Sequence, residues 1–427
     1  MTKIKDLPVQ ELKALYKNLK IKYTEYQNQN LKLDMSRGKP APEQLDLSSD
    51  MLSVINSDED TFTENNTDTR NYGGLDGIPE AKELFSAMLE VKPGEIIIGA
   101  NSSLNMMYNV ISLAMFHGEY NSKKPWNNYE KISFLCPSPG YDRHFSICEH
   151  FNINMITVDM TPTGPDMQKV AELVAKDETI KGVWCVPKYS NPDGITYSDE
   201  TVEKLASMEA AAADFRIFWD NAYAHHHISD NEDTLKNIFT ACQSAGNPER
   251  VYVFGSTSKI TYAGSGVAMM ASGDNNRKNY LRHIAIQTIG PDKVNQLRHV
   301  RFLRDMDYLK EHMRKQARIL KPKFDKVLNI LDEELKDEEI AWWTKPNGGY
   351  FISLNTMDNC AKKVVNMAAE AGLTLTGVGA TFPYGKDPRD RNIRLAPSFP
   401  SVKELQKAID IVVLCVKIVT IEEKYLG

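Results

Sequence analysis

The chain has 427 residues, with 51 Lys and Arg against 57 Asp and Glu, so its formal net charge at pH 7 is −6. Apolar residues make up 42% and charged residues 25%, as is typical of a globular protein long enough to bury a large core. The mild acidity argues against nucleic acid as a partner and against a polybasic membrane anchor, because both need clustered basic side chains.

The cysteines and the apolar runs indicate in which cellular compartment the protein is expected. Six cysteines are scattered without a Cys-x-x-Cys pair, mostly in apolar contexts, which is typical of buried free thiols in a reducing environment. The N-terminus lacks the apolar core of a signal peptide, and the longest apolar stretch near the C-terminus, 411–416, is too short to span a membrane. We therefore expect a soluble cytoplasmic protein.

The first part of the chain predicts a helix followed by a long loop. Residues 6–27 place Leu and Tyr at helical spacing, whereas residues 31–77 are rich in Asp, Ser, Asn, Gly and Pro. From residue 78 onwards, short apolar strands alternate with helices. Strands are expected at 95–98, 132–136, 153–158, 182–186, 215–219 and 251–254, and helices at 78–91, from about 102, and at 141–150, 165–176 and 199–213. This alternation predicts an α/β fold with a mainly parallel sheet covered on both faces.

After about residue 291 the pattern changes to α+β. A helical region to roughly 337 is followed by strands at 340–344 and 350–354, a helix at 359–371, a strand near 393 and a helix at 401–421. We expect the N-terminal segment to join this region as one smaller domain.

Polar residues gather just after the predicted strands, where parallel sheets bind their ligands. The runs there are Gly99-Ala-Asn-Ser-Ser103, Pro137-Ser-Pro-Gly-Tyr141, Ser190-Asn-Pro-Asp-Gly194, Asp220-Asn-Ala-Tyr223 and Ser256-Thr-Ser-Lys259. Each run alone is an ordinary turn, cap or core aromatic. Together they suit pyridoxal 5′-phosphate (PLP), which needs a lysine amine, an acid for the ring nitrogen, phosphate donors and an arginine for the substrate carboxylate.

These runs, with Asn71-Tyr-Gly-Gly-Leu-Asp-Gly77, resemble those of class I aminotransferases, the fold-type I PLP enzymes related to aspartate aminotransferase. Asn347-Gly-Gly-Tyr-Phe351 and Asn392-Ile-Arg-Leu-Ala396 match later motifs of the family, so the resemblance spans about residues 31–421. The chain looks like a member of a divergent bacterial subgroup of this family. The resemblance implies a large domain at 49–299 with a mainly parallel seven-stranded sheet, and a smaller α+β domain formed by 1–48 and 300–427.

The resemblance also implies roles for individual residues. Lys259 would form the Schiff base with PLP and shuttle the proton, and Asp220 would pair with the pyridine nitrogen. Tyr223 and Asn191 would bond the ring O3′, and Tyr141 would stack on the ring. The residues expected at the cofactor phosphate are Ala100, Asn101, Ser102, Ser256, Ser258 and Ser265.

Further implied roles concern the substrate and a second subunit. Arg394 would bind the substrate α-carboxylate, with Gly38 and Asn191 nearby. Tyr72 would reach the phosphate of a partner subunit, which implies a homodimer with shared active sites.

Two positions depart from the family pattern. The arginine that usually follows the lysine is missing in Lys259-Ile-Thr-Tyr-Ala-Gly-Ser-Gly266, so the phosphate charge must be met by hydroxyl groups, by backbone N–H groups or by a basic residue from elsewhere. Asp193 replaces the threonine common in the family's Asn-Pro-Thr-Gly motif.

The expected reaction is transamination between L-aspartate and 2-oxoglutarate by a ping-pong mechanism, with amino acids and 2-oxo acids as substrates. Arg37 is the favoured cation for a substrate side-chain carboxylate, with Lys39, Lys293 and Arg298 as other candidates; a solvated surface arginine is an equal interpretation of Arg37.

Other functions stay open at this point. They are transamination of alanine or aromatic amino acids, β-elimination or decarboxylation on the same cofactor, and, more remotely, a PLP-binding regulator, although no basic helix-turn-helix pattern precedes the motifs. No metal site is predicted, because the adjacent side chains of His225, His226 and His227 would diverge along a strand.

Overall fold

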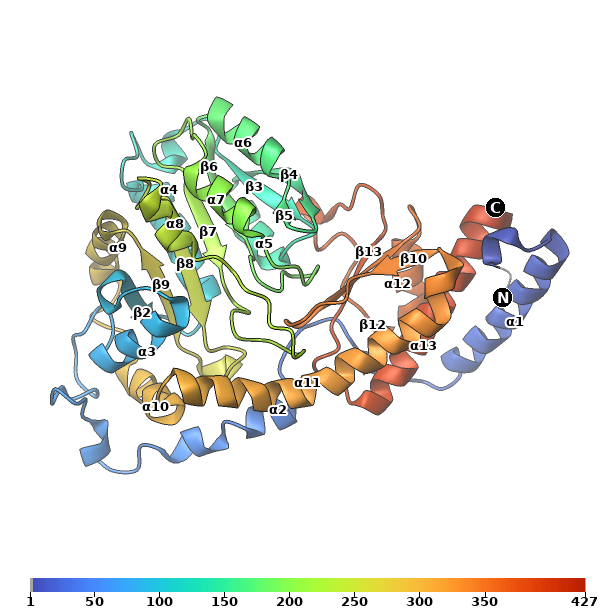
Figure 1. The fold of residues 1–427 in the computed structure, drawn as a ribbon, viewed down its shortest axis with the longest axis horizontal. Helices are drawn as coiled ribbons and strands as arrows, with labels where there is room; N and C mark the ends of the chain where they lie inside the picture. The colour runs from blue at the N-terminus through green and yellow to red at the C-terminus, as the bar shows by residue number, and fades with distance from the viewer. Residues whose placement is uncertain (1–2, 427) are drawn as a thin grey trace.

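The computed structural model describes residues 3–426 and is built around one large sheet. Its strand order is β2-β9-β8-β7-β6-β3-β4-β5 (Figure 1). The strands are β2 (Ile96–Gly99), β3 (Ser133–Ser138), β4 (Asn154–Thr161), β5 (Gly164–Pro165), β6 (Ile180–Cys185), β7 (Arg216–Asp220), β8 (Val251–Ser256) and β9 (Ala268–Ser272). All run in one direction except β9 and β5, so the prediction of a mainly parallel sheet is confirmed, with the two-residue β5 added at one edge.

Helices cover both faces of this sheet (Figure 1). One face packs on α3 (Pro79–Leu89), α6 (Met167–Lys176), α7 (Asp199–Ser207), α8 (Ile238–Ser244) and α10 (Lys293–Leu303). The other packs on α4 (Ser103–His117), α5 (Asp142–His150) and α9 (Asp274–Gln287). Side chains alternate between the two cores along each strand: in β7, Ile217 and Trp219 face one core and Phe218 faces the other. This double burial explains why the strands are continuously apolar.

The rest of the chain forms two small sheets with their own core. Strands β10 (Ala341–Trp343), β11 (Ile352–Thr356) and β13 (Asn392–Leu395) pair antiparallel, and β1 (Leu33–Asp34) pairs parallel with β12 (Leu373–Thr374). Helices α1 (Val9–Gln27), α12 (Ala361–Glu370) and α13 (Val402–Thr420) pack around them. The N- and C-terminal segments thus share one core, whereas the domain boundaries themselves stay a prediction.

Helix α11 (Met306–Leu335) runs from the large sheet to the small ones (Figure 1). The sequence predicted one helical region over about 291–337, but α10 and α11 are separate helices divided at Arg304, whose φ is +59°. The expected loop at 31–77 also contains the short helix α2 (Pro42–Asp46) and the 3-10 turns η2 (Ser49–Ser53) and η3 (Glu59–Thr61).

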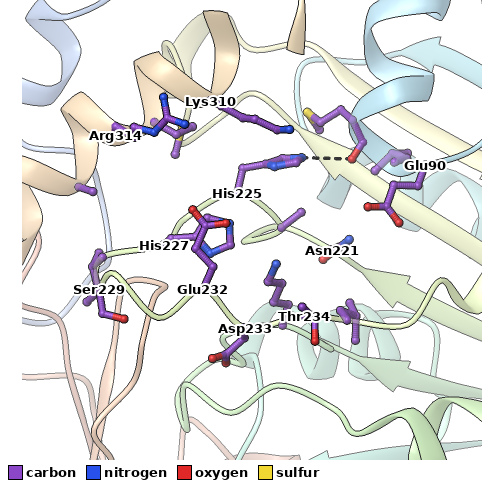
Figure 2. A pocket seen from close by; sticks show the side chains of 18 of the residues that line it. Glu90, Asn221, His225, His227, Ser229, Glu232, Asp233, Thr234, Lys310 and Arg314 are labelled. Atoms are coloured by element: carbon purple, nitrogen blue, oxygen red, sulfur yellow. Dashed lines mark hydrogen bonds and ion pairs between the residues drawn. The ribbon is translucent and has the colours of Figure 1, made fainter. Parts of the chain in front are cut away.

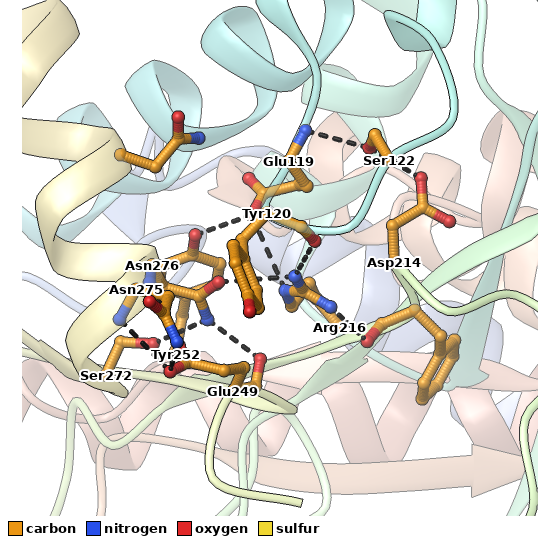
Figure 3. Close-up of polar contacts among 12 residues, drawn as sticks. Glu119, Tyr120, Ser122, Asp214, Arg216, Glu249, Tyr252, Ser272, Asn275 and Asn276 are labelled. Atoms are coloured by element: carbon orange, nitrogen blue, oxygen red, sulfur yellow. Dashed lines mark hydrogen bonds and ion pairs between the residues drawn. The ribbon is translucent and has the colours of Figure 1, made fainter.

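A buried polar network fastens the amino ends of the strands (Figure 3). Arg216, the first residue of β7, donates to the carbonyl oxygen of Tyr120 at 2.6 Å and to Asn276 Oδ1 at 3.2 Å. Glu119 accepts a hydrogen bond from Tyr252 at 2.7 Å and lies 3.5 Å from Arg216 Nε. The network therefore ties β7 and β8 to the segment after α4.

Within residues 3–426, no helix combines the length and the apolar character that crossing a bilayer requires.

Candidate functional site

The carboxyl ends of three neighbouring strands bring the predicted residues together. β7 lies between β6 and β8, ends at Asp220, and is flanked by Asn191 after β6 and Lys259 after β8. Asp220 and Asn191 are 2% and 3% exposed, so both polar groups are buried at the edge of the sheet. The strand ends therefore form one polar centre, as the sequence predicted.

Asp220 is held by a residue that the sequence analysis did not single out. His144 Nε2 lies 3.0 Å from Asp220 Oδ2, and because a carboxylate only accepts, the imidazole donates. The His144 ring stacks on Trp184 with centroids 4.3 Å apart and an interplanar angle of 10°. Asp220 Oδ1 is buried and has no hydrogen-bond partner among the described residues. One carboxylate oxygen is therefore hydrogen-bonded within the protein, and the other is left without a partner.

The amine of Lys259 lies among aromatic side chains. Its Nζ is 5.0 Å from the ring centroid of Tyr223 and 5.9 Å from that of Tyr350. Burial raises the pKa of the Tyr223 phenol, and burial raises the pKa of Tyr141 to about 12 against the opposing charge of Lys259. Both phenols are therefore neutral donors at neutral pH.

The main chain of Lys259 is held by His226. His226 Nε2 lies 3.2 Å from the Lys259 carbonyl oxygen, which can only accept. Burial and the charge of Lys259 lower the pKa of His226 to about 3, so the ring is neutral and donates through Nε2. His225 and His227 contact different partners, the Met88 carbonyl oxygen at 3.2 Å and the Tyr189 hydroxyl at 2.7 Å. The three imidazoles thus diverge.

Arg394 joins the small sheets to the large one. It lies in β13, is 6% exposed, and its Nη1 contacts Asn191 Oδ1 at 3.2 Å and Asp142 Oδ1 at 2.8 Å. Its guanidinium carbon lies 5.0 Å from the ring centroid of Phe351. A Cβ at Gly38 would lie 2.5 Å from Phe351 Cζ, so the backbone of Gly38 passes directly beside this ring. The predicted carboxylate-binding residues are therefore adjacent.

The predicted phosphate end is a set of hydroxyl and backbone groups. Ser102 is the N-cap of α4, where its Oγ accepts from Asn105 N at 3.4 Å. The hydroxyls of Ser256 and Ser258 are 3.1 Å apart. The amide of Ala268 donates to the Ala100 carbonyl oxygen at 2.9 Å. These contacts bring the start of α4 beside the loop after β8, a place where helix N–H groups favour an anion.

A glycine and an asparagine shape the turn where the family arginine is missing. A Cβ at Gly266 would lie 2.7 Å from the carbonyl oxygen of Asn101, so only glycine lets the two turns approach. Asn295 of α10 donates to the carbonyl oxygens of Ser265 and Gly266, each at 3.1 Å, and accepts from Ser265 Oγ at 3.2 Å. The Ser265 hydroxyl proton is therefore already directed at Asn295. Sequence reasoning missed Asn295, because this contact is purely tertiary.

Some predicted residues lie at the surface or point elsewhere. Tyr72 is 82% exposed, and Arg37 is exposed. Lys39 lies over the ring of Phe399 at 4.0 Å, and Lys293 donates to the carbonyl oxygen of Gly73 at 2.8 Å. Lys293 thus holds the loop that carries Tyr72.

A cavity of about 780 Å³ lies apart from this polar centre. Figure 2 shows it lined by His225 and His227, with Lys310 and Arg314 of α11 nearby. Asn221 and Ala224 also line it, whereas Lys259, Asp220 and Arg394 do not. The cavity therefore borders the segment 221–227 that follows Asp220.

The residues present fit PLP. The unpartnered Asp220 Oδ1 can accept from a protonated ring nitrogen, and the start of α4 with the hydroxyls of Ser102, Ser256 and Ser258 can hold a phosphate. Lys259 supplies the amine that the aldehyde requires. Among the residues described, no cluster of His, Cys, Asp and Glu could hold a metal ion.

Comparison with known proteins identifies the family. The family model described as aspartate amino-transferase matches residues 7–427. An aspartate aminotransferase of Corynebacterium glutamicum is 45% identical over 419 residues, 98% of this chain and 96% of the relative. The crystal structure of an aspartate transaminase from the same species superposes with a TM-score of 0.95 at 44% identity, covering 98% of this chain and 99% of that one.

A more distant structure shares the fold. It is an α-aminoadipate aminotransferase of Thermus thermophilus, with a TM-score of 0.75 at 18% identity, covering 93% of this chain and 95% of that one. The family match and the close relatives span nearly the whole chain. The chain therefore belongs to the aspartate aminotransferase family and is an aminotransferase whose cofactor is pyridoxal 5′-phosphate.

Proposed function

We propose that this enzyme transfers the amino group of L-aspartate to 2-oxoglutarate, with Lys259, Asp220 and Arg394 as its central residues. The observation that carries the proposal is their convergence: the Lys259 amine beside Tyr223, an unpartnered oxygen on buried Asp220, and Arg394 against Asn191. The names of the C. glutamicum relatives support aspartate as the donor.

Each central residue has one task in this scheme. When bound, PLP supplies an electron sink that stabilises negative charge at the substrate Cα. Lys259 Nζ takes the proton from Cα, and Arg394 fixes the substrate by its α-carboxylate. Asp220, kept in place by His144, holds a proton at the ring nitrogen. Because one product leaves before the second substrate binds, the kinetics are ping-pong.

The remaining assignments extend this scheme. Asn191 and Tyr223 bind the ring oxygen and Tyr141 covers the ring. Tyr72 serves the phosphate of a second copy in a homodimer, which its exposure of 82% supports. Six free, buried cysteines support a reducing compartment such as the cytoplasm. We also retain the division into a large domain at 49–299 and a smaller domain formed by 1–48 and 300–427.

Specificity for a dicarboxylate requires a second cation. Arg37 stays the predicted residue, and the fold adds Arg143, which is exposed and directly follows Asp142 in the first turn of α5. Replacing Arg37 by Ala and Arg143 by Gln separates the two. The residue that binds the side-chain carboxylate lowers kcat/KM for aspartate when replaced but leaves that for alanine unchanged.

A panel of amino donors against 2-oxoglutarate tests the substrate assignment. We expect L-aspartate to give the highest kcat/KM, with one glutamate formed per oxaloacetate. Higher values for alanine or an aromatic amino acid would make the aspartate assignment wrong. Release of ammonia or pyruvate without an acceptor would instead indicate elimination chemistry.

A further inference from the structure

The guanidinium of Arg394 is already engaged by the protein. Nη1 carries two hydrogens, and its two acceptors are Asp142 Oδ1 at 2.8 Å and Asn191 Oδ1 at 3.2 Å. Nε points to Thr376 Oγ1 at a long 3.4 Å. Nη2 has no hydrogen bond to any residue in the range 3–426. Of the two terminal nitrogens of Arg394, Nη1 thus has both hydrogens bonded and Nη2 has none bonded among the described residues.

A carboxylate binds arginine best through two parallel N–H groups. With both Nη1 hydrogens in use, a substrate carboxylate that needs Nη1 and Nη2 must displace one acceptor. Asn191 is 3% exposed, so its side chain is buried. The Asp142 side chain is 33% exposed and makes no other hydrogen bond within the described chain. Asp142 is therefore the acceptor that can leave.

The position of Asp142 suits such a movement. It is the first residue of α5, at the helix N-terminus, where a carboxylate is also stabilised when it turns away from Arg394. Its neighbours Tyr141 and His144 belong to the site, so the carboxylate lies beside the reacting groups. Between turnovers it also neutralises an arginine that would otherwise be a buried unpaired charge.

We propose that Asp142 is an internal stand-in for the substrate α-carboxylate: it occupies Arg394 in the free enzyme, is displaced by each substrate, and thereby lowers affinity for both. This inference rests on the proposed role of Arg394 as the carboxylate anchor. It makes Asp142 a determinant of substrate affinity that acts by competition. A residue that merely orients Arg394 would have the opposite effect on affinity when it is removed.

The test uses the PLP-loaded enzyme and the unreactive dicarboxylate maleate. Asp142→Asn keeps the shape of the side chain and removes its charge. We expect the Kd of maleate, measured by calorimetry, to fall about tenfold. KM for aspartate and for 2-oxoglutarate should fall with it, while kcat stays within about threefold. Asp142→Ala should tighten maleate binding at least as much.

Two control variants distinguish failure of the Arg394 anchor assignment from failure of the Asp142 stand-in role. Glu149→Gln removes the same charge from an exposed position of the same helix and should leave the Kd of maleate unchanged. Arg394→Gln should abolish maleate binding; if it does not, the anchor assignment fails and takes this inference with it. If Arg394 is essential but both Asp142 variants bind maleate as the wild type does, or more weakly, the stand-in role alone is overturned. A thermal unfolding curve for each variant shows that the protein is folded.

Discussion

The two ends of strand β7 differ in how far the protein itself pairs their buried polar groups. At the amino end, Arg216 contacts Tyr120, Asn276 and Glu119, and Tyr252 completes the network (Figure 3). At the carboxyl end, four residues further along the chain, one oxygen of Asp220 contacts His144 and the other has no hydrogen-bond partner in the part of the chain that is described.

The difference separates the polar groups that hold the fold from those that bind a ligand. Leaving a buried polar atom unpaired costs about 1–3 kcal/mol, so an open carboxylate oxygen is retained only where something offsets that cost. Around Arg216 the protein itself supplies the partners: the terminal nitrogens are hydrogen-bonded, and Nε, which has no hydrogen bond among the described residues, lies 3.5 Å from the Glu119 carboxylate. Asp220 Oδ1 has no hydrogen-bond partner within residues 3–426 and suits a donor from a ligand. Variants at the two ends should therefore lose different properties.

The largest expected effect is on activity, at the carboxyl end. Asp220→Asn keeps the size of the side chain but removes the charge that holds a proton at the ring nitrogen. We expect kcat to fall about 10³-fold, the magnitude of a lost electrostatic partner. The thermal midpoint should fall little or rise, because an uncompensated charge has been removed. A folded variant with kcat within tenfold of the wild type would show that Asp220 does not serve the ring.

The next effect is on stability, at the amino end. Arg216→Met leaves Glu119 as a buried charge without its cation, and the free energy of unfolding should fall by about 3–5 kcal/mol. The kcat of the folded fraction should stay within about twofold. Denaturant unfolding at 25 °C and kinetics on the same sample measure both. Arg282→Met, on the exposed face of α9, is the matched control. If Arg216→Met lowered kcat without lowering the free energy of unfolding, Arg216 would serve activity and not stability, and the proposed difference between the two ends would be wrong.

A smaller effect is expected on cofactor affinity, at the predicted phosphate end of the site. Asn295→Ala removes the amide that holds the Ser265-Gly266 turn. We expect the Kd of PLP to rise about tenfold, because a well-placed hydrogen bond is worth about 1–1.5 kcal/mol. At saturating PLP, kcat should be nearly normal. Equilibrium dialysis measures the Kd, and an unchanged value would exclude a role for Asn295 in the phosphate end.

The smallest effect depends on pH. Burial raises the pKa of Asp193, beside Asn191, to about 6 from 3.8. Since the folded state binds the proton more tightly, the charged carboxylate lowers stability above pH 6, and this penalty fades as the pH falls from 6 to 4. Asp193→Asn should therefore stabilise the protein by about 1–2 kcal/mol at pH 8 and by almost nothing at pH 4. A gain that is equal at both pH values would contradict the assignment.

Much of the carboxyl end could be predicted from the sequence. Short apolar strands and the runs that follow them located Asn191, Asp220 and Lys259 at one edge, because parallel strands end together. Strand β9 (Ala268–Ser272) was not located, since Ala-Met-Met-Ala-Ser has no β-branched residue. The division between α10 and α11 was missed because Arg304, not glycine, takes the positive φ there.

The partners of the site residues could not be predicted. His144 lies 76 residues from Asp220, and Asp142 lies 252 residues from Arg394. Such pairs depend on how α5 packs at the sheet edge and on how the small sheets meet the large one. Periodicity and local motifs carry no information on either. Sequence motifs therefore predict the groups proposed to bind the cofactor more readily than the groups that position them.

The most direct test of the central claim is a single-turnover measurement on PLP-loaded enzyme given L-aspartate and no 2-oxo acid. The wild type and Lys278→Ala, an exposed lysine on α9, should each release one equivalent of oxaloacetate per subunit. Lys259→Ala should release none, because no amine remains to take the Cα proton. Oxaloacetate release by Lys259→Ala at the wild-type rate would contradict the assignment of Lys259.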